Sequence, residues 1–332
     1  MKAVYIERYG GNDVVKLGDL PKPELRPADL LVGVRAASVN PVDFKTRDGM
    51  LKLIRPYRFP LILGSDLSGV VIETGAAVTR FKPGDEIFAR LDKDRIGSFA
   101  EFAAVGQDCA ALKPPDLSHL EAASVPLAGL TAWQALLDVA QLRAGKKVLI
   151  HAGSGGVGMF AIQIAKHFGA TIATTVSERN IELVKQLGAD VVIDYRRERF
   201  EDALSDYDIV FDTMAGETQL RSFGALRRGG VLVTIAGMPS AKYIRESGLN
   251  PLLAWAMAWM NRKATRLAKK HDVRFEYLFM RPDGLQLAEI AKLLEGGVIK
   301  PVIDKVYPLD QVKDALAYSE SGHTTGKVVI QV

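Results

Sequence analysis

The strongest structural signal in the chain is the stretch Val148-Leu149-Ile150-His151-Ala152-Gly153-Ser154-Gly155-Gly156-Val157-Gly158. An apolar run typical of a buried strand leads into glycines 153, 155 and 158, which match the spacing G-x-G-x-x-G. Glycines at these points let the backbone approach a pyrophosphate, and the N-terminus of the following helix attracts its charge. A plain strand–helix turn would also use glycine, but the surrounding βαβ pattern favours dinucleotide binding.

Strand-like and helical segments alternate after this motif. Val/Ile-rich runs joined by helices are typical of a parallel sheet covered on both faces. The spacing Ser118-His119-Leu120-Glu121 predicts a capping box that opens a helical stretch reaching Ala140. We therefore expect a doubly wound α/β domain over 123–296. Its expected strands are 147–151, 171–176, 190–194, 209–213, 231–236 and 275–280, and its expected helices are 156–168, 178–187, 217–227 and 285–295.

The two ends of the chain show a different pattern of secondary structure. Residues 1–115 contain many short β-like runs separated by Pro- and Gly-bearing turns, and the runs 302–308 and 327–332 resemble them. We expect one mostly β domain built from 1–122 and 297–332, with the α/β domain inserted between these parts.

Composition excludes several classes of protein. The 332 residues are 48% hydrophobic and 25% charged, as in a globular protein. Cys109 is the only cysteine, which excludes an intramolecular disulfide and a multi-thiolate metal site. The longest apolar run, Leu252–Met260, is too short to span a bilayer, and the N-terminal residues lack the apolar core of a signal peptide. These features predict a cytoplasmic protein.

The residues after the second strand bear on the choice of cofactor. An NAD site has a carboxylate about 20 residues after the glycine loop, at the end of this strand. Here Ser177 can donate to a phosphate and Arg179 can neutralise one, which favours NADPH. Glu178 argues for NAD, and Ser177 has an alternative role as a helix N-cap.

Residues 30–70 contain neither Cys nor His, and the five histidines are scattered. Because catalytic zinc needs three protein ligands, we expect no metal. Hydride transfer without a metal needs an electrophilic substrate, such as an enal, an enone or a quinone.

Several motifs together resemble the zinc-free quinone oxidoreductase and alkenal/enone reductase branch of the medium-chain dehydrogenase/reductase superfamily, including its reticulon-interacting mitochondrial homologues. The similarity runs nearly from end to end. It rests on residues 37–43 (ASVNPVD), 64–71 (GSDLSGVV), 81–87 (FKPGDEI), 130–132 (LTA), the glycine loop, 187–195 and 326–329 (GKVV).

This resemblance implies a Rossmann domain inserted into a GroES-like catalytic domain, with the active site in the cleft between them and NADPH as cofactor. Ser154, Gly155, Gly156 and Val157 would hold the pyrophosphate, and Ser177 and Tyr195 the 2′-phosphate. The residues implied to border the nicotinamide are Asn40, Thr131, Ala236, Gly237, Phe279 and Met280. Many relatives have Lys where Asn180 stands, and Arg179 would substitute for it.

Three residues are candidates for a catalytic role, and each has a structural alternative. Asn40 and Asp43 either belong to the active-site cleft, or Asn40 forms a turn and Asp43 caps the following short helix. Tyr57 reaches the substrate or is an ordinary loop aromatic. No residue stands out as an obligatory general acid.

A basic amphipathic insertion is predicted at 241–272. The net charge of the chain is +4, and residues 241–270 hold seven Lys or Arg and one Glu. Because the cations concentrate there, we expect no nucleic-acid partner. Four interpretations stay open: a lid over the cleft, a dimer contact, a membrane-surface helix at 250–270, or packing on the α/β domain.

The sequence thus predicts a zinc-independent, NADPH-dependent oxidoreductase that transfers hydride to a small lipophilic enone, enal or quinone. The alternatives are a quinone-only reductase and an NADPH-binding interaction protein with little turnover. The resemblance also implies a homodimer.

Overall fold

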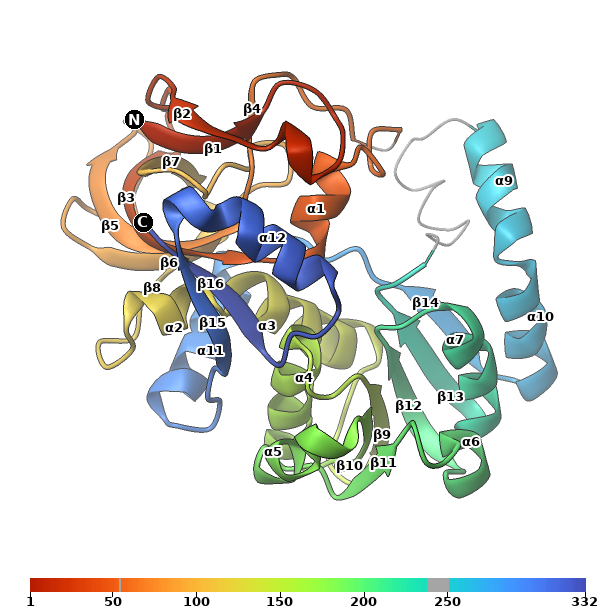
Figure 1. Cartoon of the computed structure of the whole chain (residues 1–332). Coiled ribbons are helices and arrows are strands. Elements are labelled where there is room, and N and C mark those ends of the chain that lie inside the picture. Colours follow the sequence, from red (N-terminus) through yellow and green to blue (C-terminus); the bar gives the residue numbers. More distant parts are fainter. Residues whose placement is uncertain (54, 238–250) are drawn as a thin grey trace. The chain divides into compact units, whose positions relative to one another are not determined.

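The computed structural model describes residues 1–53, 55–237 and 251–332, with the side chains of 251–254 left out. Its contacts divide the chain into unit 1 (Met1–Leu130 and Arg281–Val332) and unit 2 (Thr131–Met280), so unit 2 is inserted between the two parts of unit 1 (Figure 1). The division differs from the boundaries 122/123 and 296/297 expected from the sequence. One reason is that α11 (Gly284–Glu295) packs on β8 (Ala110–Leu112) in unit 1.

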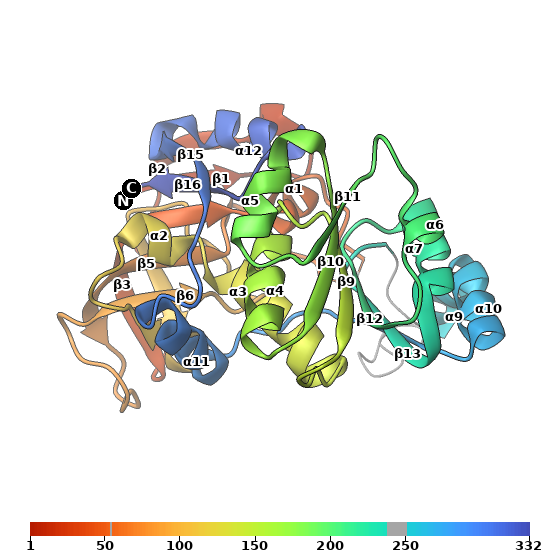
Figure 2. The same cartoon turned by 90° about the horizontal axis from the view of Figure 1, so that it is seen from below.

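The described part of unit 2 contains a six-stranded parallel sheet in the order β11-β10-β9-β12-β13-β14. The chain order proceeds outward on both sides of β9 and β12, which is the expected doubly wound arrangement. Helices α4 and α5 cover one face, and α7 and α10 cover the other (Figure 2). The strands are β9 (Lys147–His151), β10 (Thr171–Val176), β11 (Val191–Asp194), β12 (Tyr207–Asp212), β13 (Leu226–Thr234) and β14 (Arg274–Tyr277); the helices are α4 (Gly156–His167), α5 (Ile181–Gln186), α6 (Phe200–Ala203), α7 (Gly216–Ser222), α9 (Pro251–Met260) and α10 (Arg262–His271).

Burial on both faces explains why these strands are continuously apolar. Val148, Leu149 and Ile150 of β9 have no exposed surface, because helices cover both sides of the sheet. Of the predicted insertion at 241–272, residues 241–250 lie outside the described residues, and α9 and α10 form most of the rest.

Unit 1 is mostly β. Its larger sheet has the order β15-β16-β3-β5-β6-β8, with β7 pairing to β3, and a smaller sheet has the order β2-β1-β4. The remaining strands are β1 (Lys2–Ile6), β2 (Lys16–Asp19), β3 (Asp29–Val39), β4 (Leu61–Ile62), β5 (Asp66–Thr74), β6 (Glu86–Arg90), β7 (Phe102–Gly106), β15 (Ile303–Pro308) and β16 (Lys327–Gln331); the helices besides α11 are α1 (Pro41–Arg47), α2 (His119–Ala123) and α12 (Val312–Glu320).

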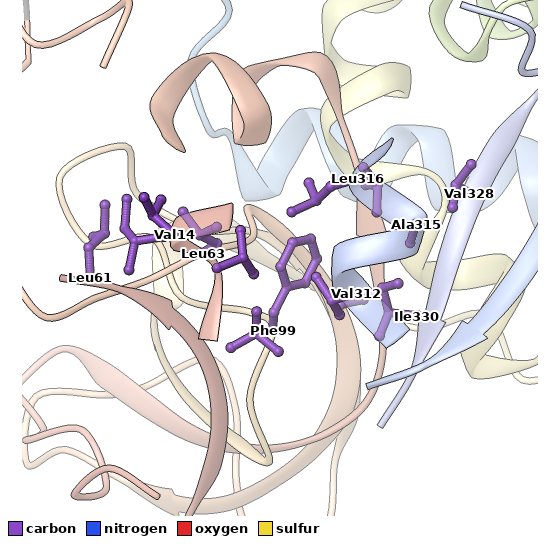
Figure 3. Packing of buried hydrophobic residues seen from close by; sticks show 14 residues of the cluster. Val14, Leu61, Leu63, Phe99, Val312, Ala315, Leu316, Val328 and Ile330 are labelled. Carbon is purple, nitrogen blue, oxygen red and sulfur yellow. The ribbon is translucent and has the colours of Figure 1, made fainter. Parts of the chain in front are cut away.

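The core of unit 1 joins its two distant sequence segments. Val312, Ala315 and Leu316 follow the spacing of one helix face on α12 and are fully buried. They belong to one apolar cluster with Phe99 and with Ile330 of β16 (Figure 3). Burial of this shared face explains why the tail folds with the N-terminal segment.

The helix expected from Ser118 to Ala140 is interrupted. The predicted capping box is confirmed, since the Ser118 hydroxyl accepts from the Glu121 N–H at 3.2 Å and the Glu121 carboxylate accepts from the Ser118 N–H at 2.9 Å. However, the stretch divides into α2, α3 (Pro126–Trp133) and a π-helical turn at Gln134–Val139. Pro126 has no N–H with which to continue α2, so a new helix begins there.

Candidate functional site

The glycine loop connects β9 to α4. Ala152 has a φ of 52°, and Gly155 is the N-cap of α4 without any side-chain capping bond. The first N–H groups of the helix are therefore available to an anion. A Cβ on Gly158 would lie 2.3 Å from the Ala152 carbonyl oxygen, and one on Gly153 would lie 2.0 Å from Thr174 Oγ1. The loop thus has the bare, partly exposed backbone that a dinucleotide pyrophosphate needs.

A hydrogen bond joins this loop to the end of the neighbouring strand. Asn180 Nδ2 donates to Ser154 Oγ at 2.9 Å. Ser177 directly follows β10 and precedes the 3-10 turn at Glu178–Asn180, but its side chain makes no capping bond. The register pairs Val176 with Asp194, which brings Ser177 and Tyr195 to adjacent strand ends. Tyr195 is 57% exposed.

Two arginines that the sequence analysis did not select lie beside Tyr195. Arg196 lies over the Tyr195 ring at 5.8 Å, and the Arg197 guanidinium is 2.6 Å from the Glu178 carboxylate. Glu178, the acid whose position favours NAD, is therefore paired with a cation. Both arginines line an open hollow with Tyr195. Their signal in the sequence is a pair of cations directly after the third strand of the domain.

The other predicted cofactor residues of unit 2 follow later strands. Ala236 and Gly237 follow β13, where the Ala236 N–H donates to Thr234 Oγ1 at 3.2 Å. Phe279 and Met280 follow β14, whereas Thr131 is buried on α3. Because parallel strands end at the same edge of their sheet, the strand-end residues share one edge with the glycine loop. This is where α/β sheets bind their ligands.

Unit 1 holds a buried polar cluster around Asn40 and Asp43. Asn40 Nδ2 donates to Asp66 Oδ2 at 2.9 Å, and Lys327 Nζ donates to Asn40 Oδ1 and to the Val39 carbonyl. The Asp43 carboxylate accepts from the Asn40 N–H at 2.8 Å and from Ser65 Oγ at 2.9 Å. Asp43 therefore has the capping role that was the alternative to a cleft role, and the cluster fixes the Asn40 amide.

Burial shifts the pKa values of the groups in this cluster. Desolvation raises the pKa of Asp43 to about 7, in spite of the bonds from Asn40 and Ser65 that favour its charged form. Desolvation also raises the pKa of Asp66 and lowers the pKa of Lys327.

The raised pKa of Asp43 predicts a pH-dependent stability. The folded pKa of about 7 exceeds the ordinary aspartate value of 3.8, so the native state binds the extra proton between these pH values. The free energy of unfolding should therefore fall by up to about 4 kcal/mol as the pH rises from 4 to 7. The variant Asp43→Asn should lack this fall, which urea unfolding at several pH values would measure. Parallel curves for both proteins would contradict the assignment.

The third catalytic candidate is tied to the backbone. The Tyr57 hydroxyl donates to the Lys93 carbonyl at 2.7 Å, and the Tyr57 N–H donates to the Tyr9 hydroxyl at 3.0 Å. Burial raises the pKa of Tyr57 to about 12, which makes it a weak acid at neutral pH. These contacts are those of a loop anchor, and they do not bring Tyr57 into the hydrogen bonds of the Asn40 cluster.

His151, which directly precedes the glycine loop, also has a structural role. His151 is fully buried, with Nδ1 3.1 Å from Thr175 Oγ1 and Nε2 2.8 Å from Ser222 Oγ. Burial lowers its pKa to about 4, so the ring is neutral at physiological pH. Among the described residues, no group of three or more His, Cys, Asp or Glu side chains is placed to hold a metal.

A mostly β unit and a doubly wound unit whose glycine loop leaves the N-terminus of α4 uncapped are typical of dinucleotide-dependent oxidoreductases. Comparisons with known families agree. Residues 26–115 match the alcohol dehydrogenase GroES-like domain, and residues 187–330 match the family described as zinc-binding dehydrogenase.

Whole-chain relatives define the branch. The mitochondrial NAD(P)H oxidoreductase RTN4IP1 of Homo sapiens is 36% identical, with 100% of this chain and 89% of the relative covered. The chloroplastic NADPH-dependent alkenal/one oxidoreductase of Arabidopsis thaliana is 35% identical, over 99% and 79%. The quinone oxidoreductase structure from Coxiella burnetii has 35% identity and a TM-score of 0.87, over 100% and 99%.

The chain therefore belongs to the quinone oxidoreductase and alkenal/enone reductase branch of the medium-chain dehydrogenase/reductase superfamily. This confirms the resemblance, the GroES-like and Rossmann fold and, at the level of the family, an NADPH-dependent oxidoreductase.

The expected cytoplasmic location is wrong by the same comparison, because similar relatives are named mitochondrial or chloroplastic. That expectation rested in part on the lack of an apolar signal core. Such a core marks a secretory signal peptide, whereas the segments that target proteins to mitochondria or chloroplasts do not have one. Among the helices that the structure describes, none is long and apolar enough to cross a membrane.

Proposed function

We propose that this protein is a zinc-independent, NADPH-dependent reductase of small lipophilic electrophiles that contain an activated C=C bond or a quinone. The observation that carries the proposal is the shared strand edge: Ser177 and Tyr195 follow adjacent strands there, and Asn180, next to Arg179, donates to Ser154 of the glycine loop that leads into the uncapped α4. The names of the Arabidopsis relative and of the Coxiella structure support these two substrate classes.

The described residues have clear roles in such a reaction. When bound, NADPH would supply the hydride for the β carbon of an enone and would be left as NADP⁺, and a proton from water would complete the saturated carbonyl. The Gly155–Val157 backbone would hold the pyrophosphate. Ser177 and Arg179 would bind the 2′-phosphate, with Arg196 and Tyr195 beside them. The buried bonds to Asp66 and Lys327 would keep the Asn40 amide in one orientation.

Zinc independence is part of this proposal. It is supported by the donor set, because the described residues bring together no three metal-binding side chains. Turnover by protein stripped with a chelator and assayed in metal-free buffer should equal that of untreated protein. Loss of turnover on stripping, restored by added Zn²⁺, would contradict it.

The decisive experiment is oxidation of NADPH and NADH by the purified protein against 2-hexenal, a vinyl ketone and 1,4-benzoquinone, with the products identified. A saturated carbonyl formed with NADPH preferred would establish the double-bond reductase. Quinone turnover alone would favour the quinone-only alternative. Tight NADPH binding without turnover of any electrophile would favour the interaction protein.

The variant Arg179→Ala should weaken NADPH selectively. A charged hydrogen bond to phosphate is worth about 1.5–3 kcal/mol, so the KM for NADPH should rise at least about tenfold while that for NADH stays within about twofold. Arg228→Ala removes an exposed arginine near the start of β13, one that lies 3.4 Å from Asp272, and serves as the control. An equal rise for both cofactors would show that Arg179 does not read the 2′-phosphate.

The homodimer stays a prediction. Among the described strands, β14 pairs only with β13 and so leaves one sheet edge for a second copy. Analytical ultracentrifugation would determine the oligomeric state.

A further inference from the structure

Helices α9 and α10 form one nearly continuous rod on unit 2 (Figure 1). The Asn261 N–H donates to the Met257 carbonyl at 3.0 Å, and the Thr265 N–H donates to the Asn261 carbonyl at 3.0 Å, so the helical bonding pattern passes through the junction. With a rise of about 1.5 Å per residue, the rod is about 30 Å long.

The inward side of the rod packs on unit 2. Met257, Ala264 and Ala268 are buried and follow each other at helical spacing. Ala264 and Ala268 belong to the apolar cluster that contains Phe223 and Leu232 of the Rossmann core. This part of the insertion therefore packs on the α/β domain, which was one of the four interpretations left open by the sequence.

The opposite side of the rod carries two exposed indoles. Trp255 is 72% exposed and Trp259 is 57% exposed, although burial of large aromatics normally stabilises a fold. They are four residues apart, hence on one face, and Arg262 continues the same line. The Arg262 guanidinium lies over the Trp259 ring at 3.9 Å.

The same side also carries a run of cations. Five cations follow the indoles, at Arg262, Lys263, Arg266, Lys269 and Lys270, and residues 251–271 contain no Asp or Glu. In the described parts of the chain, the side chains of the last four have no ion-pair partner. The first acid after them, Asp272, is 3.4 Å from Arg228. We call this surface, with its two indoles and five cations, the outer face.

We propose that the outer face binds the surface of a bilayer that contains anionic phospholipids. Indole rings prefer the headgroup level of a membrane, and cations on the same helix face gain from the negative surface potential. The long row of cations with no acid among them is complementary in charge to such a plane. This inference goes beyond the proposed function and does not depend on it, because it concerns no residue of the cofactor site.

Vesicle sedimentation tests the proposal with the full chain. The protein should bind vesicles of phosphatidylcholine with phosphatidylglycerol at low salt, and it should bind pure phosphatidylcholine much more weakly. Tryptophan emission should shift to the blue on binding. Since each cation near an anionic surface contributes about fivefold in affinity, replacing Lys263, Arg266, Lys269 and Lys270 by Gln should weaken binding about 100-fold or more.

Two further proteins separate charge from hydrophobic contact. A matched control replaces four exposed lysines elsewhere, Lys16, Lys185, Lys292 and Lys313, by Gln and should bind like the wild type. The double variant Trp255→Ser/Trp259→Ser should bind at least about tenfold more weakly, with an unchanged thermal midpoint. Three results would overturn the proposal. The first is an equal loss of vesicle binding in the lysine control, and the second is binding of an RNA oligonucleotide but not of vesicles. The third is a dimer that dissociates in the outer-face variants while no protein binds vesicles.

Discussion

Gly158→Ala should destabilise the protein by more than about 3 kcal/mol and abolish NADPH binding. Its Cβ would lie 2.3 Å from the Ala152 carbonyl oxygen and 2.8 Å from Gly153 Cα. These are backbone atoms of the loop itself, so no side chain can move to relieve the overlap, and the strand–helix contact must open. Thermal and urea unfolding would measure the loss.

A second glycine in the same loop should behave differently. A Cβ on Gly155 has its nearest neighbour at 3.3 Å, so Gly155→Ala should keep the free energy of unfolding within about 1 kcal/mol. It should still weaken NADPH binding at least about tenfold, because the methyl group occupies the approach of the pyrophosphate. Gly224→Ala, which meets no atom within 4 Å, is the control for both. Unchanged NADPH affinity in Gly155→Ala would exclude this loop as the pyrophosphate site.

Lys327→Met should destabilise unit 1 by about 3–5 kcal/mol. Lys327 is 4% exposed, and its ammonium lies 4.0 Å from the fully buried Asp66 carboxylate while donating to Asn40 Oδ1. Removal of one partner from a buried ionic group leaves the other charge without compensation. Chemical unfolding at neutral pH would measure the effect.

Coupling to Asp66 distinguishes lost charge pairing from lost packing. The double variant Lys327→Met/Asp66→Asn should recover much of the stability, because it leaves no unpaired charge. Lys292→Met, at an exposed position on α11, should change the free energy of unfolding by no more than about 0.5 kcal/mol. Strictly additive losses in the double variant would show that the two side chains do not interact.

Features that depend on neighbouring residues were readable from the sequence. The glycine loop, the Ser118 capping box and the alternation of strands with helices act within a few residues, so the doubly wound class followed from them. A helix cap by Asp43 was one of the two interpretations that the sequence left open, and the bond that forms it joins residues only three apart. The interruption of the expected helix at Pro126 also depends on neighbouring residues. It was not predicted, because the apolar composition of the stretch favoured one continuous helix.

Features that join distant residues needed the tertiary structure. Asn40 reaches Asp66 across 26 positions and Lys327 across 287, so no local pattern could reveal this buried cluster or the raised pKa of Asp43. The pairing of Glu178 with Arg197, which bears on the choice of cofactor, depends on the register between β10 and β11. The two sides of α9–α10 are likewise defined by which residues pack on unit 2. In each case the chain supplies the chemical groups, and their spatial neighbours decide their charge, exposure and partners.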